Sequence, residues 1–149
     1  MVYLINQDLE FAKSKLLKED LNLVIVKNGQ LVFKTKKEGI IGILESLDTL
    51  DKELINSSIA DKIVGMAASM LFVYAKVSAV FTQLISDPGL KILQENNIAS
   101  QFEKRVPNIL NHRQNDVCPF EKQAIASKTV EEAYHNLRSF ANQKKLKKR

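Results

Sequence analysis

The sequence has a single cysteine, Cys118, among its 149 residues. One thiol cannot form an intrachain disulfide, and it cannot supply a metal site that needs several cysteines. Long apolar runs are also missing, because the longest, from Ile63 to Ala75, is too short to cross a bilayer. Polar residues from Asn6 to Glu10 interrupt the first eleven residues, which therefore do not resemble a secretory signal. We expect a cytoplasmic protein with no membrane segment.

Most of the chain has no excess of charge of either sign. The net charge of +5 comes from residues 144–149, which hold five of the 22 basic residues, and the other 17 balance the 17 acidic residues. A neutral body offers no electrostatic footprint for a nucleic-acid duplex. We expect one domain over residues 1–143 and a basic C-terminal tail over 144–149, and we interpret that tail as a solvated helix end.

The predicted elements follow one another as in a single α/β domain. Both the length and the hydrophobic content of 45% suit one globular domain. Apolar residues form one stripe over 8–19, which predicts a helix. Two strand-like runs, 21–27 and 30–35, flank Asn28-Gly29, and this pattern predicts a hairpin because both turn positions need a positive φ.

Helices and strands alternate after the hairpin. We expect helices over 40–50, 61–75 and 88–96, a short helix from Cys118 and a last helix capped by Thr129, with strands over 54–60, 77–82 and, irregularly, within 98–106. The helix from Asp61 is apolar nearly all round and should be buried on several sides, with Gly65 and Ser69 allowing close approach of a neighbour. The pattern predicts a three-layer α/β/α domain whose mixed sheet is opened by a β-hairpin.

Two segments carry a resemblance to a known family. Residues 60–68 (ADKIVGMAA) follow a strand, and Cys118-Pro119-Phe120-Glu121 opens a later helix. With the element order, they make the chain, from about Leu9 to Leu137, similar to a small prokaryotic family of uncharacterised proteins, domain of unknown function 1893, which has a cytidine-deaminase-like fold. The resemblance implies that fold and the importance of the two segments, but no established activity.

The residues argue against zinc deaminase chemistry. A zinc deaminase needs His-x-Glu at one helix start and Pro-Cys-x-x-Cys at the next. The corresponding positions read Lys37-Glu38-Gly39-Ile40 and Ala60-Asp61-Lys62-Ile63, with no histidine and no cysteine. His112, Asp116 and Cys118 are types of side chain that zinc accepts, but their spacing matches no standard site. We therefore predict no zinc and no other cofactor.

The candidate ligand site combines the two predicted helix starts. An aspartate at the start of a helix is usually a structural cap, yet the same place in α/β sheets often binds phosphates. Cys118 is either a small packed residue or a thiol activated by its helix, although no spacing rule pairs it with a base. The candidate ligand-binding residues are Ser58, Asp61, Lys62, Asn111, Arg113, Cys118 and Glu121.

Three functions are compatible with these residues. The leading hypothesis is a small-molecule-binding domain, for a nucleotide or related phosphorylated metabolite, with its pocket between the helix start at Asp61 and the segment 111–121. The alternatives are a structural or regulatory protein-interaction module, because no catalytic set is complete, and a cysteine-dependent enzyme using Cys118. We expect no specific nucleic-acid partner and no membrane partner. Homo-oligomerisation and enzyme activity both stay open.

Overall fold

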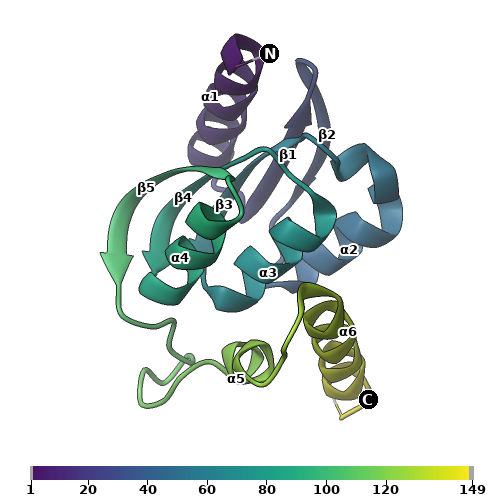
Figure 1. Ribbon diagram of the computed structural model, residues 1–149, viewed down its shortest axis with the longest axis vertical. Helices are drawn as coiled ribbons and strands as arrows, with labels where there is room; N and C mark the ends of the chain where they lie inside the picture. Colours follow the sequence, from purple (N-terminus) through teal and green to yellow (C-terminus); the bar gives the residue numbers. More distant parts are fainter. Residues whose placement is uncertain (1, 148–149) are drawn as a thin grey trace.

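The computed structural model describes residues 2–147, which form a five-stranded sheet with helices on both faces (Figure 1). The strands, in the spatial order β2-β1-β3-β4-β5, are β1 (Leu23–Lys27), β2 (Gln30–Thr35), β3 (Ser58–Val64), β4 (Ala79–Ser86) and β5 (Ala99–Val106). The helices are α1 (Val2–Glu19), α2 (Ile41–Leu50), a 3-10 turn η1 (Asp51–Leu54), α3 (Met66–Ala75), α4 (Asp87–Glu95), α5 (Pro119–Ile125) and α6 (Val130–Lys147).

The sheet is mixed, because β1 runs antiparallel to β2 and β3, whereas β3, β4 and β5 are parallel. One face is covered by α1, which packs on β1, β3 and β4. The other face carries α2, α3 and α4, and the C-terminal helices α5 and α6 pack on α3. Each face has its own apolar core. The predicted three-layer α/β/α architecture, with a mixed sheet opened by a hairpin, is therefore confirmed.

The hairpin turns at Asn28-Gly29, as predicted, and both residues have a positive φ, 52° and 76°. Helix α1 holds this turn from outside the hairpin. The carboxylate of Asp8, buried at the sheet face of α1, accepts hydrogen bonds from the backbone amides of Asn28 and Gly29, each at 2.9 Å. The first helix and the first turn are therefore held together by Asp8. The spacing of apolar residues did not predict this contact.

Asp61 does not begin a helix, and this prediction was wrong. Asp61 lies inside β3, where it pairs with Leu23 of β1 and Thr82 of β4. Helix α3 starts at Met66, with Gly65 in extended conformation before it. The β-branched residues around Asp61 prolong the strand to Val64, and the sheet pairing on both sides outweighs the capping preference of the aspartate.

Other boundaries also differ from those expected from the sequence. The strand expected at 54–60 begins only at Ser58, since Leu54 belongs to η1. Strand β5 is longer than expected and pairs with β4 along its length. The capping of the last helix is confirmed, because the hydroxyl of Thr129 accepts from the amide of Glu132 at 3.1 Å. No helix in the described part of the chain is long and apolar enough to span a membrane.

Helix α3 is the centre of the larger core. Most of its residues are buried, as its continuous apolar sequence predicted. A Cβ at Gly89 of α4 would lie 2.8 Å from the backbone of Gly65 and 3.1 Å from Oγ of Ser69, so the two helices touch there without intervening side chains. The predicted close approach at Gly65 and Ser69 is thus confirmed.

Helix α6 is tied to the domain by an aromatic stack and an arginine. The rings of Tyr134 and Tyr74 are stacked, with centroids 4.5 Å apart. Arg138 donates to the carbonyl of Leu44 at 3.1 Å and forms an ion pair with Asp48 at 2.5 Å, both on α2. The helix continues to Lys147, so the first residues of the basic segment 144–149 are helical, and residues 148 and 149 lie outside the described part.

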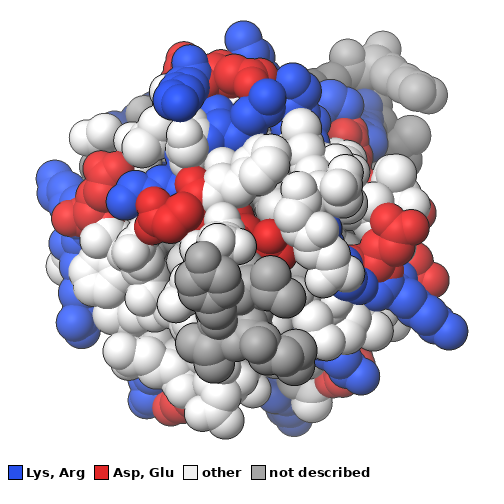
Figure 2. All heavy atoms as spheres, turned by 90° about the horizontal axis from the view of Figure 1, so that it is seen from above, with Lys and Arg blue, Asp and Glu red and all other residues white. Residues whose placement is uncertain are grey.

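Basic and acidic side chains lie close together on the face shown in Figure 2. Ion pairs also join different elements of the fold: Glu19 at the end of α1 binds Lys34 of β2 at 3.0 Å, and Asp20 binds Lys62 of β3 at 2.8 Å. This mixing agrees with the neutral charge of the body of the chain.

Candidate functional site

The start of α3 is closed by a carboxylate from a distant helix. Glu121 of α5 accepts hydrogen bonds from the backbone amides of Met66, at 2.7 Å, and Ala67, at 2.6 Å, one with each carboxylate oxygen. These amides have no acceptor within their own helix, and a negative charge there is favoured by the helix dipole. Glu121 is therefore the cap of α3, 55 residues away along the chain.

Gly65 makes room for this cap. A Cβ at Gly65 would overlap with a carboxylate oxygen of Glu121 and would lie 2.6 Å from its Cδ and 2.8 Å from a side-chain carbon of Ile109. Only a residue without a side chain allows Glu121 to reach the amides. The two sequence segments singled out above therefore meet, through Gly65 in one and Glu121 in the other.

The loop before α5 brings Glu121 into position. Leu110 and Val117 form an isolated antiparallel bridge, and the amide of Cys118 donates to the carbonyl of Ile109 at 3.0 Å, which closes the loop at its base. Pro119 then starts α5, as predicted, and places Glu121 in the first turn. Burial raises the pKa of Glu121, although the amides of Ala67 and Met66 act in the opposite direction.

Asp61, like Asp8 and Glu121, has a buried carboxyl group; it is 6% exposed and lies in the middle of the sheet. Burial is the main cause that raises its pKa to about 8, against 3.8 for an exposed aspartate, and hydrogen bonds from the backbone at Ile63 and Lys62 lower it only in part. The contact with the Ile63 amide is long, 3.4 Å. Burial in the sheet thus favours the neutral, protonated form of Asp61 at neutral pH.

The other candidates on β3 do not join Asp61. Lys62 follows it in the strand and its ammonium group binds Asp20, at the end of α1 on the opposite face of the sheet. Ser58 is buried at the first position of β3, opposite Val26 and Ala79, and so lies at the other end of the strand from α3. The structure therefore separates the three β3 candidates instead of gathering them.

The polar loop is organised by its own side chains. The amide of Asn111 donates to Asn115 at 2.9 Å and accepts from the backbone of Asn115 at 3.2 Å, while Arg113 is exposed at the tip. Cys118 is half-buried, and within the described residues its thiol forms no hydrogen bond with His112 or Glu121. No three histidine, cysteine, aspartate or glutamate side chains of residues 2–147 are grouped to hold a metal ion.

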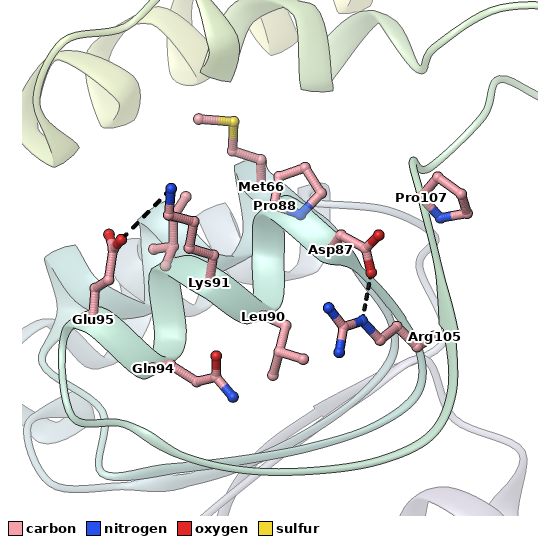
Figure 3. Close-up of a pocket in the computed structure, with 10 residues that line it drawn as sticks. Met66, Asp87, Pro88, Leu90, Lys91, Gln94, Glu95, Arg105 and Pro107 are labelled. Carbon is pink, nitrogen blue, oxygen red and sulfur yellow. Dashed lines mark hydrogen bonds and ion pairs between the residues drawn. The ribbon is translucent and has the colours of Figure 1, made fainter.

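An open hollow of about 740 Å³ lies beside the capped end of α3 (Figure 3). Its walls come from the carboxyl ends of all three parallel strands: Met66 follows β3, Asp87 follows β4, and Arg105 and Pro107 lie at the end of β5. The rest of the lining belongs to α4, where Lys91 faces Glu95 at 3.9 Å. Asp87 and Arg105 form an ion pair at 2.5 Å.

Sequence reasoning missed this hollow almost completely. Of its lining residues, only Met66 lies in a segment that the motifs singled out. No usable signal marked them, because the strand expected over 77–82 ends well before Asp87, and Arg105 lies in the segment 98–106, whose strand was expected to be irregular.

The structure is thus a three-layer α/β domain in which a glutamate from the C-terminal part closes the helix that follows the third strand. The family model described as TM1506, Domain of unknown function (DUF1893), matches residues 11–141. The chain belongs to this family, and the resemblance noted in the sequence is confirmed to that extent.

The solved structure of a DUF1893 family protein agrees with this assignment. A DUF1893 family protein (TM1506) from Thermotoga maritima is 28% identical, with a TM-score of 0.82 over 89% of each chain. Acinetobacter baumannii RibD, in form 1 and form 2, is 21% identical, with a TM-score of 0.47 over 68% of this chain and 34% of the RibD chain. No curated protein matches the chain.

Proposed function

We propose that the protein is a cytosolic small-molecule-binding domain whose ligand, a nucleotide or related phosphorylated metabolite, binds in the hollow at the carboxyl edge of β3, β4 and β5. The observation that carries this proposal is the convergence of residues from the ends of all three parallel strands on one hollow. Open α/β sheets bind ligands at this edge, because strand ends and helix starts present polar groups together there.

The lining suits a ligand with an anionic and an apolar part. Arg105 and Lys91 provide two cations, and an incoming phosphate competes with Asp87 for the guanidinium group of Arg105. Met66 and Pro107 provide apolar surface in the same lining, and this surface suits contact with a base or a sugar ring. Figure 3 shows the pair between Asp87, at the start of α4, and Arg105 of β5, and the Lys91–Glu95 pair within α4.

The hydrogen bonds at the start of α3 support a ligand position beside this helix start and not directly on it. The amides of Met66 and Ala67 already bind Glu121, so a phosphate at this point would have to displace a buried carboxylate. We assign Glu121 a positioning role, because it fixes the backbone of Met66, a lining residue. Cys118 contributes the amide that closes the loop base.

We also propose that the fold is a variant of the cytidine-deaminase-like fold without its zinc site. The order of a helix, a hairpin and then alternating helices and strands supports this relation. The helix starts that would carry zinc ligands read Gly39-Ile40-Ile41 and Gly65-Met66-Ala67, and neither contains histidine or cysteine. In place of metal ligation, the second of them binds a carboxylate of the same chain.

Ligand-induced thermal shifts test the proposal. The intact protein is screened against nucleoside phosphates and sugar phosphates, and the stabilising compounds are then titrated calorimetrically. A double variant, Lys91→Met with Arg105→Met, should lose the stabilisation, whereas Lys104→Met with Lys128→Met, two exposed lysines outside the hollow, should retain it. If no compound stabilises the protein, or if both double variants respond like the wild type, the proposed site is wrong.

The cysteine-dependent alternative has a separate test. An activated thiol is alkylated faster than free cysteine at neutral pH, because the thiolate is the reacting species. The thiol of Cys118 has no hydrogen-bonded base among the described residues, so we expect ordinary alkylation kinetics. Faster alkylation that is lost in His112→Ala would favour the enzyme over the binding domain.

A further inference from the structure

One edge of the sheet is a long, exposed strand. β5 ends the strand order, so no strand of the described residues pairs with its outer side, and Figure 1 shows no helix beyond it. Five consecutive residues, 101–105, are exposed, and Phe102 is exposed to 39%. An edge strand of eight residues with free backbone groups is a ready template for another strand.

The opposite edge is less suited to pairing. The register between β2 and β1 shifts at Ile25/Val26, and β2 contributes partly buried side chains, among them Val32 and Phe33, to the core. Such irregularities twist an edge and interrupt its regular hydrogen-bonding groups. β5 is therefore the edge that can extend the sheet.

The sequence of β5 is complementary to itself in one antiparallel register. Residues opposite one another in a continuous sheet have side chains on the same face. A two-fold axis must therefore run midway between a residue and the same residue of the second copy. An axis at Phe102 places that ring against its counterpart, Gln101 against the partner's Glu103, Ser100 against the partner's Lys104 and Ala99 against the partner's Arg105. No like charges are then opposed, and residues 99–105 all take part.

Neighbouring registers are worse. An axis at Glu103 sets two carboxylates against each other, and an axis at Lys104 does the same with two ammonium groups, which destabilises a strand pair. An axis at Gln101 avoids this but leaves Lys104 and Arg105 outside the paired segment. The charged residues thus discourage other pairings and permit the one centred on Phe102.

We propose that two copies of this chain associate through β5, antiparallel about a two-fold axis at Phe102, so that their sheets form one ten-stranded sheet. The partner is a second copy because the favourable register requires the residues of β5 on both sides. Arg105 lines the ligand hollow and also lies in the paired segment, whereas Phe102, at the axis, is not among the residues that line the hollow.

Sedimentation equilibrium of the full chain over a wide concentration range tests the association, and circular dichroism verifies that each variant is folded. Phe102→Asp sets two carboxylates on the axis and should raise the dimer dissociation constant about tenfold or more. Phe11→Asp is the matched control, since Phe11 is exposed to 41% on α1. A wild type that stays monomeric, or equal effects of both substitutions, overturns the proposal.

Disulfide trapping tests the register directly. In a Cys118→Ser background, Phe102→Cys brings two thiols opposite each other, within the separation that a disulfide spans. Lys104→Cys places them about 13 Å apart along the strands, too far for a bond. Rapid cross-linking of the first variant alone supports the register, and equal or reversed rates contradict it.

Discussion

Replacement of Gly65 by alanine should destabilise the protein through a residue 56 positions away. The new methyl group occupies the place of a carboxylate oxygen of Glu121 and lies 2.6 Å from its Cδ. The backbone at Gly65 is extended, with φ at −109°, so alanine itself is compatible with the local conformation. The penalty therefore comes from the displacement of Glu121 and from the amides that lose their acceptor.

The magnitude follows from the two hydrogen bonds lost. Each bond from a backbone amide to a charged acceptor is worth about 1.5–3 kcal/mol net. The burial that raises the pKa of Glu121 offsets part of this gain. We therefore expect Gly65→Ala and Glu121→Ala each to lower the free energy of unfolding by about 3 kcal/mol. Urea unfolding measures both values.

A double-mutant cycle separates this explanation from a general intolerance of substitution. If both changes remove the same contact, the double variant should be scarcely less stable than either single variant, with a coupling energy of about 2 kcal/mol or more. Glu131→Ala, on the exposed side of α6, serves as the control for loss of a glutamate. Additive effects of Gly65→Ala and Glu121→Ala would refute the reasoning.

Three further predictions concern other parts of the fold. The pKa of Asp61 is about 8 in the folded chain against 3.8 when exposed, so unfolding releases a proton between these pH values and stability falls as pH rises. Asp61→Asn should abolish this fall, by about 1.4 kcal/mol per pH unit, in urea unfolding between pH 5 and 7, and parallel wild-type and variant profiles would contradict it. Asp8→Ala should cost about 2 kcal/mol and speed hydrogen exchange at Asn28 and Gly29, whose amides lose their acceptor, whereas Glu10→Ala on the exposed side of α1 should change neither. Ser69→Ala should leave stability unchanged or raise it by up to about 1 kcal/mol, because the buried hydroxyl lacks a partner in the described residues, and a clear loss in thermal unfolding would show that the hydroxyl is bonded.

The architecture could be predicted because local signals determined it. Asn28-Gly29 specified the hairpin, and the apolar sequence of α3 indicated a buried central helix. The error at Asp61 has a physical reason: a capping residue was given more weight than the strand pairing on both sides, which no local pattern contains. The contact between Gly65 and Glu121 likewise depends on the closure of a distant loop.

The site was predictable only in part. The two motifs do meet, because Gly65 leaves room for Glu121, which caps α3. Glu121 already accepts hydrogen bonds from the amides of the helix start that was expected to bind a ligand. The hollow beside it depends on which strand ends are adjacent, and adjacency follows from the strand order. Residues such as Arg105, within a segment expected to be irregular, therefore gave no sign of their position.

The contact between Asp8 and the hairpin turn has a consequence for how the chain acquires its structure during synthesis. All its partners lie within the first 35 residues, so the contact between α1 and the hairpin turn does not need β3. The start of α3, by contrast, has to wait for Glu121, and α3 carries much of the larger core. A nascent chain can therefore form part of the α1 face early, but the core of that face needs β3 and β4, and the other face stays incomplete until the C-terminal helices have emerged.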